Sequence, residues 1–551
     1  MTGSNTVAGR LLDQLGAAGC DVVFGLPGVH NLAFWDAQGP GRPRIVGVRH
    51  EQAAVYAADG LARATGRVQA ALTTSGPGAA NAVGAFGEAV ASRSPVLLIS
   101  SEPPMRSARR SGEDTGLLHS MPNQAAMFST PFDAFTLRLP SSVEASHLLP
   151  TVLRILDSIP APGYLGIPAD VLAMTADEHD PQLTDFYERR PDLAPSVPEP
   201  ADVERLAELL EGKRVVIWAG PEVIHAGAEA LLTDVATRLG APVIATYGAR
   251  GLMAGHRLLV DAPPHEPEIA ELIASADLML VVGDDLQGMS TRNWTMPIPA
   301  VIAAITRYAG TSLGDYDIAV RLECEVATTL TMLLAAMVPI TADPWLTRDV
   351  AADVRVRLRN DPRGRAGMAF VDAVARGWPM DSPVIADMCV AGYWTGGYLP
   401  AVRPRRMQYP VGWGTLGYGL PAAIGTAAAG IPTLAVVGDG GAAMSVGELA
   451  TFVQECLPIT LVLVDDGGYG MLRFDQQAFG HPERGVDLLG PNWLELAAAF
   501  GLGAEAADIS QLDAALARAH QANVAGTPRM IVVTATLHPP RTTSPRWHEG
   551  V

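Results

Sequence analysis

Lysine is almost absent from this chain, and cysteine is scarce. Of the 551 residues only Lys213 is a lysine. An enzyme that forms a Schiff base would have to use this residue, which lies where a predicted strand begins. No GxxxxGK stretch occurs, which excludes P-loop phosphate chemistry. The 4 cysteines are too scattered for a disulfide framework or a zinc knuckle, and such sparse use suits the cytoplasm.

Positive charge is also in deficit, with 39 Lys and Arg against 58 Asp and Glu and a net charge of −19. Because binding to phosphate backbones needs a basic surface, we expect no nucleic-acid partner. Residues 1–16 lack the basic and then apolar pattern of a signal peptide. One uncharged run, 407–438, contains seven glycines and three prolines, which favours buried strands and tight turns over a membrane helix. We therefore expect a cytoplasmic protein without a membrane contact.

One pattern recurs three times along the chain: a buried apolar strand, a glycine turn, a helix and a second buried strand. The three copies begin at Val68, Val215 and Thr433. Continuous β-branched runs joined by helices predict parallel sheets covered on both faces. Segments 177–200 and 338–367 are rich in proline and charge and are typical of linkers. The predicted fold is α/β, with three doubly wound parallel-sheet domains at 1–176, 190–340 and 366–551.

Two aspartates follow neighbouring strands of the third copy. Asp439 lies in the turn Gly438-Asp439-Gly440, and Asp466 stands at the end of the next strand. Adjacent parallel strands bring two such carboxylates side by side, where glycine turns also bind anionic ligands. Two carboxylates and a backbone carbonyl leave room for diphosphate oxygens on an octahedral Mg²⁺. Either residue alone could be an ordinary turn aspartate, but their joint spacing predicts a metal site.

The stretch from Gly438 to Asp466 resembles the diphosphate and metal motif of thiamin diphosphate (ThDP) enzymes, and the resemblance covers nearly the whole chain. It implies a pyrimidine-binding, a central and a diphosphate-binding domain, in that order. It also implies that Asp439, Asp466 and the carbonyl of Gly468 hold Mg²⁺. The family usually has asparagine at position 466. The extra charge of Asp466 should tighten Mg²⁺ and repel the diphosphate, and the sequence does not say which effect wins.

Glu51 stands between a short strand over 44–49 and an alanine-rich helix that continues through Ala64. A carboxyl group buried at such a junction has a raised pKa unless a partner compensates. A glutamate that satisfies the helix dipole is the alternative interpretation. In ThDP enzymes a glutamate in this setting hydrogen-bonds the pyrimidine N1′. The resemblance implies that Glu51 holds a proton there and so favours the imino tautomer, whose 4′-nitrogen can deprotonate C2.

The glycine-rich segment 412–421 resembles the part of ThDP enzymes that lies below the thiazolium ring. By position Leu416 is the bulky residue that supports a V-shaped cofactor, and the Gly414 carbonyl accepts a bond from the 4′-amino group. A glycine-rich core turn is the alternative. The other residues that the resemblance implies for cofactor binding are Gly438, Gly440, Gly441, Asp387 and Tyr469.

Two histidines bear on the reaction. His30 follows the segment 24–29, which is similar to benzaldehyde lyase, where a histidine occupies the matching place. His119 aligns with the active-site glutamine of that enzyme, and pyruvate decarboxylases have a histidine in a similar setting. Two side chains that exchange protons near neutral pH, placed beside the cofactor, suit cleavage or formation of a carbinol bond. The alternative interpretation is a pair of ordinary surface or core histidines. With Glu51, the predicted catalytic residues are therefore His30 and His119.

The chain as a whole resembles most the acetolactate synthase group, which joins two 2-oxoacids with loss of CO₂. Two positions depart from that group. Val390-Ala391 stands where a Gln-His pair touches the diphosphate, and segment 260–265 lacks the glycine and methionine expected at a flavin contact. FAD is therefore doubtful.

These features predict a ThDP- and Mg²⁺-dependent carboligase or lyase. It would act on 2-oxoacids or 2-hydroxyketones through a C2 carbanion/enamine intermediate. A simple 2-oxoacid decarboxylase and a non-catalytic ThDP-fold binding protein are the alternatives. The resemblance implies a homodimer at least, with a tetramer plausible, because the family's cofactor lies between two subunits. The Pro-rich tail over 538–551 could act as a lid.

Overall fold

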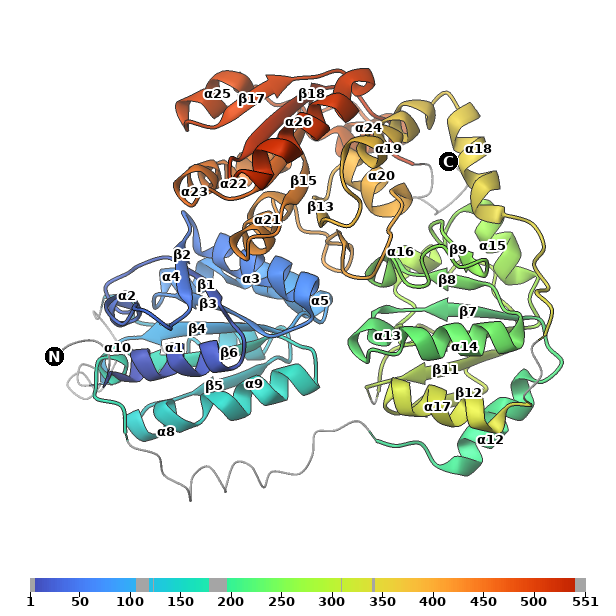
Figure 1. Cartoon of the computed structure of the whole chain (residues 1–551), viewed down its shortest axis with the longest axis horizontal. Coiled ribbons are helices and arrows are strands. Elements are labelled where there is room, and N and C mark those ends of the chain that lie inside the picture. Colours follow the sequence, from blue (N-terminus) through green and yellow to red (C-terminus); the bar gives the residue numbers. More distant parts are fainter. Residues whose placement is uncertain are drawn as a thin grey trace.

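The computed structural model describes residues 5–105, 118–121, 123–177, 196–308, 310–338 and 342–540. Within these ranges the chain forms three six-stranded sheets (Figure 1). This confirms the predicted α/β class with three doubly wound parallel-sheet domains, whereas the exact domain boundaries stay predictions. No helix in the described part of the chain is long and apolar enough to cross a membrane. Most of the C-terminal tail, 541–551, lies outside the described residues.

The first sheet has the order β2-β1-β3-β4-β6-β5, in which the four inner strands are fully buried and the two edge strands are partly exposed. Its strands are β1 (Val22–Gly25), β2 (Arg44–Gly47), β3 (Gln69–Thr73), β4 (Val96–Glu102), β5 (Phe135–Arg138) and β6 (Gly163–Pro168). The helices around it are α1 (Val7–Ala17), α2 (Leu32–Asp36), α3 (Glu51–Thr65), α4 (Pro77–Asn81), α5 (Val83–Ala91), α7 (Ala126–Ser129), α8 (Ser142–His147), α9 (Leu149–Ser158) and α10 (Ala169–Leu172).

The central sheet has a different order, β12-β11-β10-β7-β8-β9, which is the arrangement of dinucleotide-binding domains. Its strands are β7 (Val215–Ala219), β8 (Val243–Ala245), β9 (Leu259–Val260), β10 (Leu278–Val282), β11 (Ile302–Thr306) and β12 (Val320–Glu323). Its helices are α12 (Pro200–Leu210), α13 (Pro221–His225), α14 (Glu229–Leu239), α15 (Pro267–Ala274), α16 (Gly288–Thr291) and α17 (Val326–Ala336), with the short 3₁₀ turn η2 (Tyr247–Ala249).

The third sheet repeats the strand order of the first, as β14-β13-β15-β16-β18-β17. Its strands are β13 (Val384–Ala386), β14 (Met407–Gln408), β15 (Thr433–Gly438), β16 (Ile459–Asp465), β17 (Gly503–Ala506) and β18 (Arg529–Thr534). Its helices and 3₁₀ turns are α18 (Val350–Asn360), α19 (Arg365–Gly377), α20 (Val390–Tyr398), α21 (Gly419–Ala428), α22 (Asp439–Ser445), η3 (Val446–Glu448), α23 (Leu449–Gln454), α24 (Gly470–Ala478), α25 (Trp493–Ala499), η4 (Ile509–Gln511) and α26 (Leu512–Val524).

Helix α3 of the first domain crosses α21 of the third at very short range (Figure 1). A methyl group built on Gly60 would lie 2.2 Å from the carbonyl oxygen of Ala422, and one built on Gly425 would lie 1.9 Å from that of Ala57. Both helices consist largely of buried small residues, and they share one hydrophobic core. The two domains are therefore joined backbone against backbone, which only glycine at these two positions permits.

This contact predicts that Gly425→Val destabilises the protein, because the added atoms have no space between the two backbones. We expect a loss of about 1–3 kcal/mol, the usual cost of overpacking a core. The measurement is the free energy of unfolding from urea denaturation. Gly84→Ala is the matched control, since a methyl group on this glycine of α5 meets nothing within 4 Å. An equal loss in both variants would contradict the prediction.

Candidate active site

A pocket opens at the carboxyl ends of β13, β15 and β16, where the strand order of the third sheet reverses. Ligands of open α/β sheets bind at this kind of crevice. One part of its lining consists of residues that the sequence predicts for the cofactor and the metal: Leu416, Gly438, Asp439, Gly440, Gly441, Asp466, Gly468 and Tyr469. The remainder is mostly apolar: Met388, Cys389, Val390, Ala391, Tyr393, Val464, Gly470, Met471, Leu472 and Leu537.

Asp439 and Asp466 lie in this pocket at the ends of paired strands, as their spacing predicts. Burial raises the pKa of Asp439 to about 6, and the charge of Asp466 adds to the shift. Burial also raises the pKa of Asp466. Oδ2 of Asp439 and Oδ1 of Asp466 are buried without a hydrogen-bond partner among the described residues. Two carboxylates with unused, buried oxygens fit a divalent cation, which would compensate both charges.

The backbone oxygen of Gly468 faces the same space, because a methyl group built on Gly440 would lie 3.6 Å from it. Among the described residues no group of three or more His, Cys, Asp or Glu side chains could hold a metal. Two carboxylates and one carbonyl would leave the other positions of an octahedral ion to oxygens from outside the protein. This donor set fits Mg²⁺ bound together with a diphosphate.

Asp387 supports the pocket without belonging to its lining. It is 1 % exposed, and its carboxylate accepts hydrogen bonds from the backbone N–H groups of Gly417 (3.0 Å), Met388 (2.7 Å) and Tyr418 (3.3 Å). These bonds hold the 412–421 segment that carries Leu416. Gly414 lies in the same segment with a φ of 78° and also stands outside the lining.

Glu51 lies at the carboxyl edge of the first sheet, where β2 passes into α3. Its side chain is buried, and Oε2 accepts a hydrogen bond of 3.0 Å from Nδ2 of Asn81. The other oxygen, Oε1, would lie 3.1 Å from a methyl group built on Gly78, which belongs to the glycine turn after β3. The carboxylate is therefore held by Asn81 on one side and lies close to the backbone of Gly78 on the other.

His30 and His119 lie side by side, with ring centroids 5.6 Å apart and planes at 80°. Nδ1 of His30 is 2.5 Å from Oγ of Ser75. Burial lowers the pKa of His30, and the neighbouring His119 adds to the shift. His30 is therefore neutral near pH 7, so it can accept a proton or pass one on.

The residues predicted for the site fall into two groups on different domains. His30, Glu51 and His119 belong to the first domain, whereas the described lining of the pocket comes entirely from residues 388–537 of the third. Within one chain they form two half-sites rather than a single cavity.

Several residues of these half-sites escape the sequence argument. Asn81 orients Glu51, Ser75 contacts His30, and Oε1 of Gln124 accepts a bond of 2.7 Å from the N–H of Gly76. Ser75 and Asn81 stand in the glycine-rich segment that follows β3. The glycines of this segment are visible in the sequence, but the contacts of these two side chains are not. Glu448, which bonds to the backbone before Glu51, carried no signal at all.

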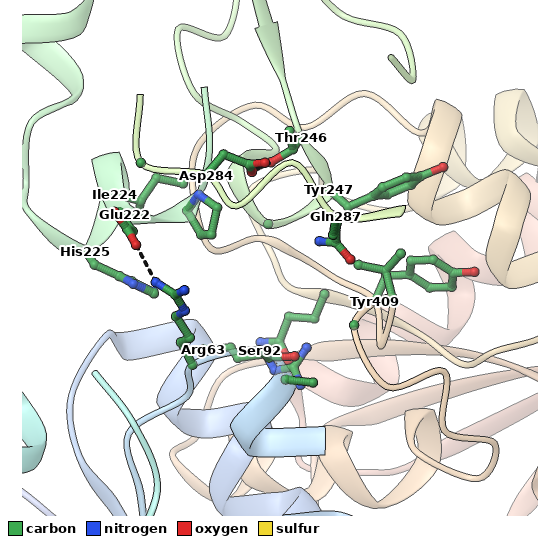
Figure 2. Close-up of a pocket in the computed structure, with 18 of the residues that line it drawn as sticks. Arg63, Ser92, Glu222, Ile224, His225, Thr246, Tyr247, Asp284, Gln287 and Tyr409 are labelled. Carbon is green, nitrogen blue, oxygen red and sulfur yellow. Dashed lines mark hydrogen bonds and ion pairs between the residues drawn. The ribbon is translucent and has the colours of Figure 1, made fainter. Parts of the chain in front are cut away.

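A second crevice lies where the three domains meet. Figure 2 shows side chains from all three domains turned toward it, among them Arg63, Glu222 and Tyr409. Its central-domain wall stands at the ends of β7 and β10, where a dinucleotide would bind in this topology. A methyl group built on Gly220, in the turn after β7, would lie 2.5 Å from Oδ2 of Asp284. That turn is already filled by a carboxylate.

Among the described residues, two of the three carboxylates that line this crevice have partners, Asp284 and Glu222. Asp284 accepts bonds of 2.9 Å from Nε1 of Trp218 and Oγ1 of Thr246. Glu222 is paired with Arg93 of the first domain and accepts a 2.8 Å bond from the N–H of Arg307. Arg63, Arg93 and Arg405 also line the crevice, so it holds charges of both signs.

Comparisons with known proteins agree with this architecture. Three family models match the chain: the N-terminal TPP binding domain of thiamine pyrophosphate enzymes at 5–127, their central domain at 203–333 and their C-terminal TPP binding domain at 387–533. A probable 2-ketoarginine decarboxylase of Pseudomonas aeruginosa is 32% identical over 90% of this chain and 88% of its own. The acetolactate synthase large subunit of Corynebacterium glutamicum is 28% identical over 87% of this chain and 77% of its own.

Solved structures share the fold. The thiamine diphosphate-dependent 4-hydroxybenzoylformate decarboxylase of Rhodococcus jostii RHA1 superimposes with a TM-score of 0.78 at 21% identity, covering 97% of this chain and 99% of that one. A putative thiamin diphosphate-dependent enzyme from Mycobacterium smegmatis gives a TM-score of 0.76 at 22% identity, covering 97% and 100%.

The paired histidines predict that His119→Ala raises the pKa of His30 toward its ordinary value. The substitution removes a like charge and admits water to the ring, and both changes favour the imidazolium. The measurement is an NMR titration of ¹³C-labelled histidine, with the His30 signal assigned by its loss in His30→Asn. Replacing the exposed His481 by alanine is the control. A pKa of His30 that stays the same or falls in His119→Ala would contradict the prediction.

Proposed function

We propose that this chain, which belongs to the thiamine pyrophosphate enzyme family and so forms or cleaves carbon–carbon bonds, is a 2-oxoacid decarboxylase. The observation that carries the proposal is the His30–His119 pair on the same sheet edge as Glu51. Release of an aldehyde after loss of CO₂ needs a proton donor beside the reacting carbon, and a half-buried imidazole pair is suited to that task. The decarboxylase relative supports the same reaction type.

Each half-site has a part in this proposal. Bound ThDP would supply a nucleophilic carbon and an electron sink for the decarboxylation. The glycine turn around Gly440 would receive the diphosphate, Leu416 would support the cofactor between its two rings, and Asp439 with Asp466 would hold Mg²⁺. Glu51, oriented by Asn81, would hold a proton at the pyrimidine N1′.

A homodimer would complete the site. The first-domain half-site would then face the third-domain pocket of the partner subunit, so that each cofactor touches both chains. The separation of the two half-sites within one chain supports this arrangement. We also propose that the reaction needs no FAD, since the carboxylate of Asp284 packs against the turn of the central domain that a dinucleotide would use and is held there by Trp218.

Carboligation is the second candidate function. The acetolactate synthase relatives favour it, and so does the mostly apolar lining around Leu416 and Met471, which would keep water from the reacting carbon. The two functions share their first step and differ in whether a proton or a second carbonyl compound captures the product of decarboxylation.

Proton NMR of the products tests both functions. Purified protein with ThDP and Mg²⁺ is given pyruvate, 2-ketoarginine or 4-hydroxybenzoylformate, each with and without an added aldehyde. We expect an aldehyde from at least one oxoacid. Glu51→Gln should retain the fold and lower turnover about 10²–10⁴-fold, the usual contribution of a positioned proton-transfer group. Acyloin or acetolactate as the main product would favour the carboligase, and full activity of Glu51→Gln would refute the proposed role of Glu51.

Removing the negative charge of Asp466 should change the affinities for Mg²⁺ and for ThDP in opposite directions. Asp466→Asn should weaken Mg²⁺ about tenfold, because affinity for hard cations follows the charge of the ligand set. The same change should strengthen binding of ThDP in the absence of metal, because one carboxylate fewer repels the diphosphate. Isothermal titration calorimetry measures both affinities.

Asp465→Asn is the matched control for this experiment. It removes the same charge one residue away, from a side chain that accepts a bond from Gly467 N–H and does not line the pocket. Its two affinities should stay close to those of the unsubstituted protein. Equal shifts in both variants would show that net charge, rather than a ligand at position 466, sets the affinities.

A further inference from the structure

The carboxylate of Glu448 crosses from the third domain to the first and binds backbone there. Glu448 is the last residue of η3 and is 1 % exposed. Its Oε1 accepts hydrogen bonds from the backbone N–H groups of Arg49 (2.8 Å) and His50 (3.1 Å). Its Oε2 accepts a bond of 2.7 Å from Oγ1 of Thr451, which fixes the direction of the carboxylate. Each oxygen of this buried group therefore has a partner.

The two N–H groups that Glu448 binds stand directly before Glu51. His50 is the N-cap of α3, and its side chain accepts a bond from the N–H of Gln52. The N–H groups at the start of a helix have no partner within the helix. A donor that loses its partner here destabilises the turn. Glu448 thus fixes the place and direction in which the chain turns from β2 into α3.

Two further contacts join the segment around Glu448 to β2 and the residues after it, but they involve side chains only. Arg44 pairs with Glu455 at 2.5 Å, and Arg49 donates from its guanidinium to Oε1 of Gln454 at 2.6 Å. Both join exposed or half-exposed side chains, and neither binds the backbone next to Glu51. Exposed pairs of this type contribute little to stability or position.

We propose that Glu448 is a positioning residue for the reaction, which sets the carboxylate of Glu51 by holding the backbone of Arg49 and His50. The proposal rests on the proposed role of Glu51 in proton transfer to the cofactor. Glu51 is already fixed on one side by Asn81. Glu448 supplies the second constraint, and it comes from the domain that carries the diphosphate pocket. A displacement of about 1 Å of a group that must form a hydrogen bond to the cofactor can reduce the rate about a hundredfold.

The first experiment uses the protein without cofactor. Hydrogen–deuterium exchange with mass spectrometry follows the peptide that contains residues 49–51. Glu448→Ala should speed exchange of this peptide, and Glu448→Gln, which keeps an accepting oxygen at Oε1, should leave it close to the unsubstituted protein. Glu455→Ala is the matched control, because it removes a carboxylate from the same interface without touching this backbone. Equal protection in Glu448→Ala and the unsubstituted protein would overturn the proposal.

The second experiment measures proton exchange at C2 of bound ThDP by NMR, together with the affinity for ThDP by calorimetry. Glu448→Ala should slow the exchange about tenfold to a hundredfold and leave the affinity nearly unchanged, since the diphosphate pocket is intact. Glu448→Gln should restore most of the rate, and Glu455→Ala should not alter it. Where Glu448→Ala fails to fold, Thr451→Val, which removes only the bond that orients Glu448, should give the same pattern more weakly.

A double variant separates positioning from a general loss of structure. If Glu448 acts through Glu51, adding Glu448→Ala to Glu51→Gln should cause no further loss of exchange. An additive loss would overturn the proposal and assign Glu448 a merely structural role. Failure of the proposed function has a different outcome, because C2 exchange would then be insensitive to Glu51→Gln itself.

Discussion

The close crossing of α3 and α21 is the constraint on which the rest of the structure depends. Gly60 and Gly425 let the two backbones touch, so the first and third sheets share one core and cannot shift independently. Helix α3 begins at Glu51, and α21 continues the segment that carries Leu416. The contact therefore fixes the start of α3, where Glu51 stands, relative to the segment before α21, which carries Leu416. A side chain at either glycine would separate the helices and, with them, the Glu51 carboxylate from the loop that carries Leu416.

Buried carboxylates near the site are compensated in different ways, and the difference indicates their tasks. Asp59 and Glu88 share the guanidinium of Arg63, and Asp387 is bonded by backbone N–H groups. Each of these has its charge balanced inside the protein, so each serves the architecture. Asp439 and Asp466 instead keep buried oxygens without a hydrogen-bond partner among the described residues. A cation between the two would balance both charges, so this pair fits a ligand site better than an ordinary turn.

The sequence predicted the parts of the molecule whose physical cause is local. Apolar runs such as Val215–Ala219 and glycine turns such as that before Asp439 predicted the three α/β domains and the place of the pocket at the end of the third sheet. The histidine pair also came together, because His30 follows a strand end and the resemblance placed His119 beside it. The contact of Glu448 with the backbone of His50 could not be predicted, since it joins residues 398 positions apart on two domains. Nothing in the residues around Glu448 encodes which backbone it will meet.

Two crevices at equivalent topological positions show that strand order alone does not decide what binds. The third sheet and the central sheet each reverse their strand order beside a glycine turn, and both could receive a diphosphate on topology. In the third sheet the turn around Gly440 lines a pocket, and two carboxylates with unused oxygens stand beside it. In the central sheet the carboxylate of Asp284 packs against Gly220 and is held there by Trp218. The same fold thus offers one site for a ligand and uses the other to join domains, and the side chains make that choice.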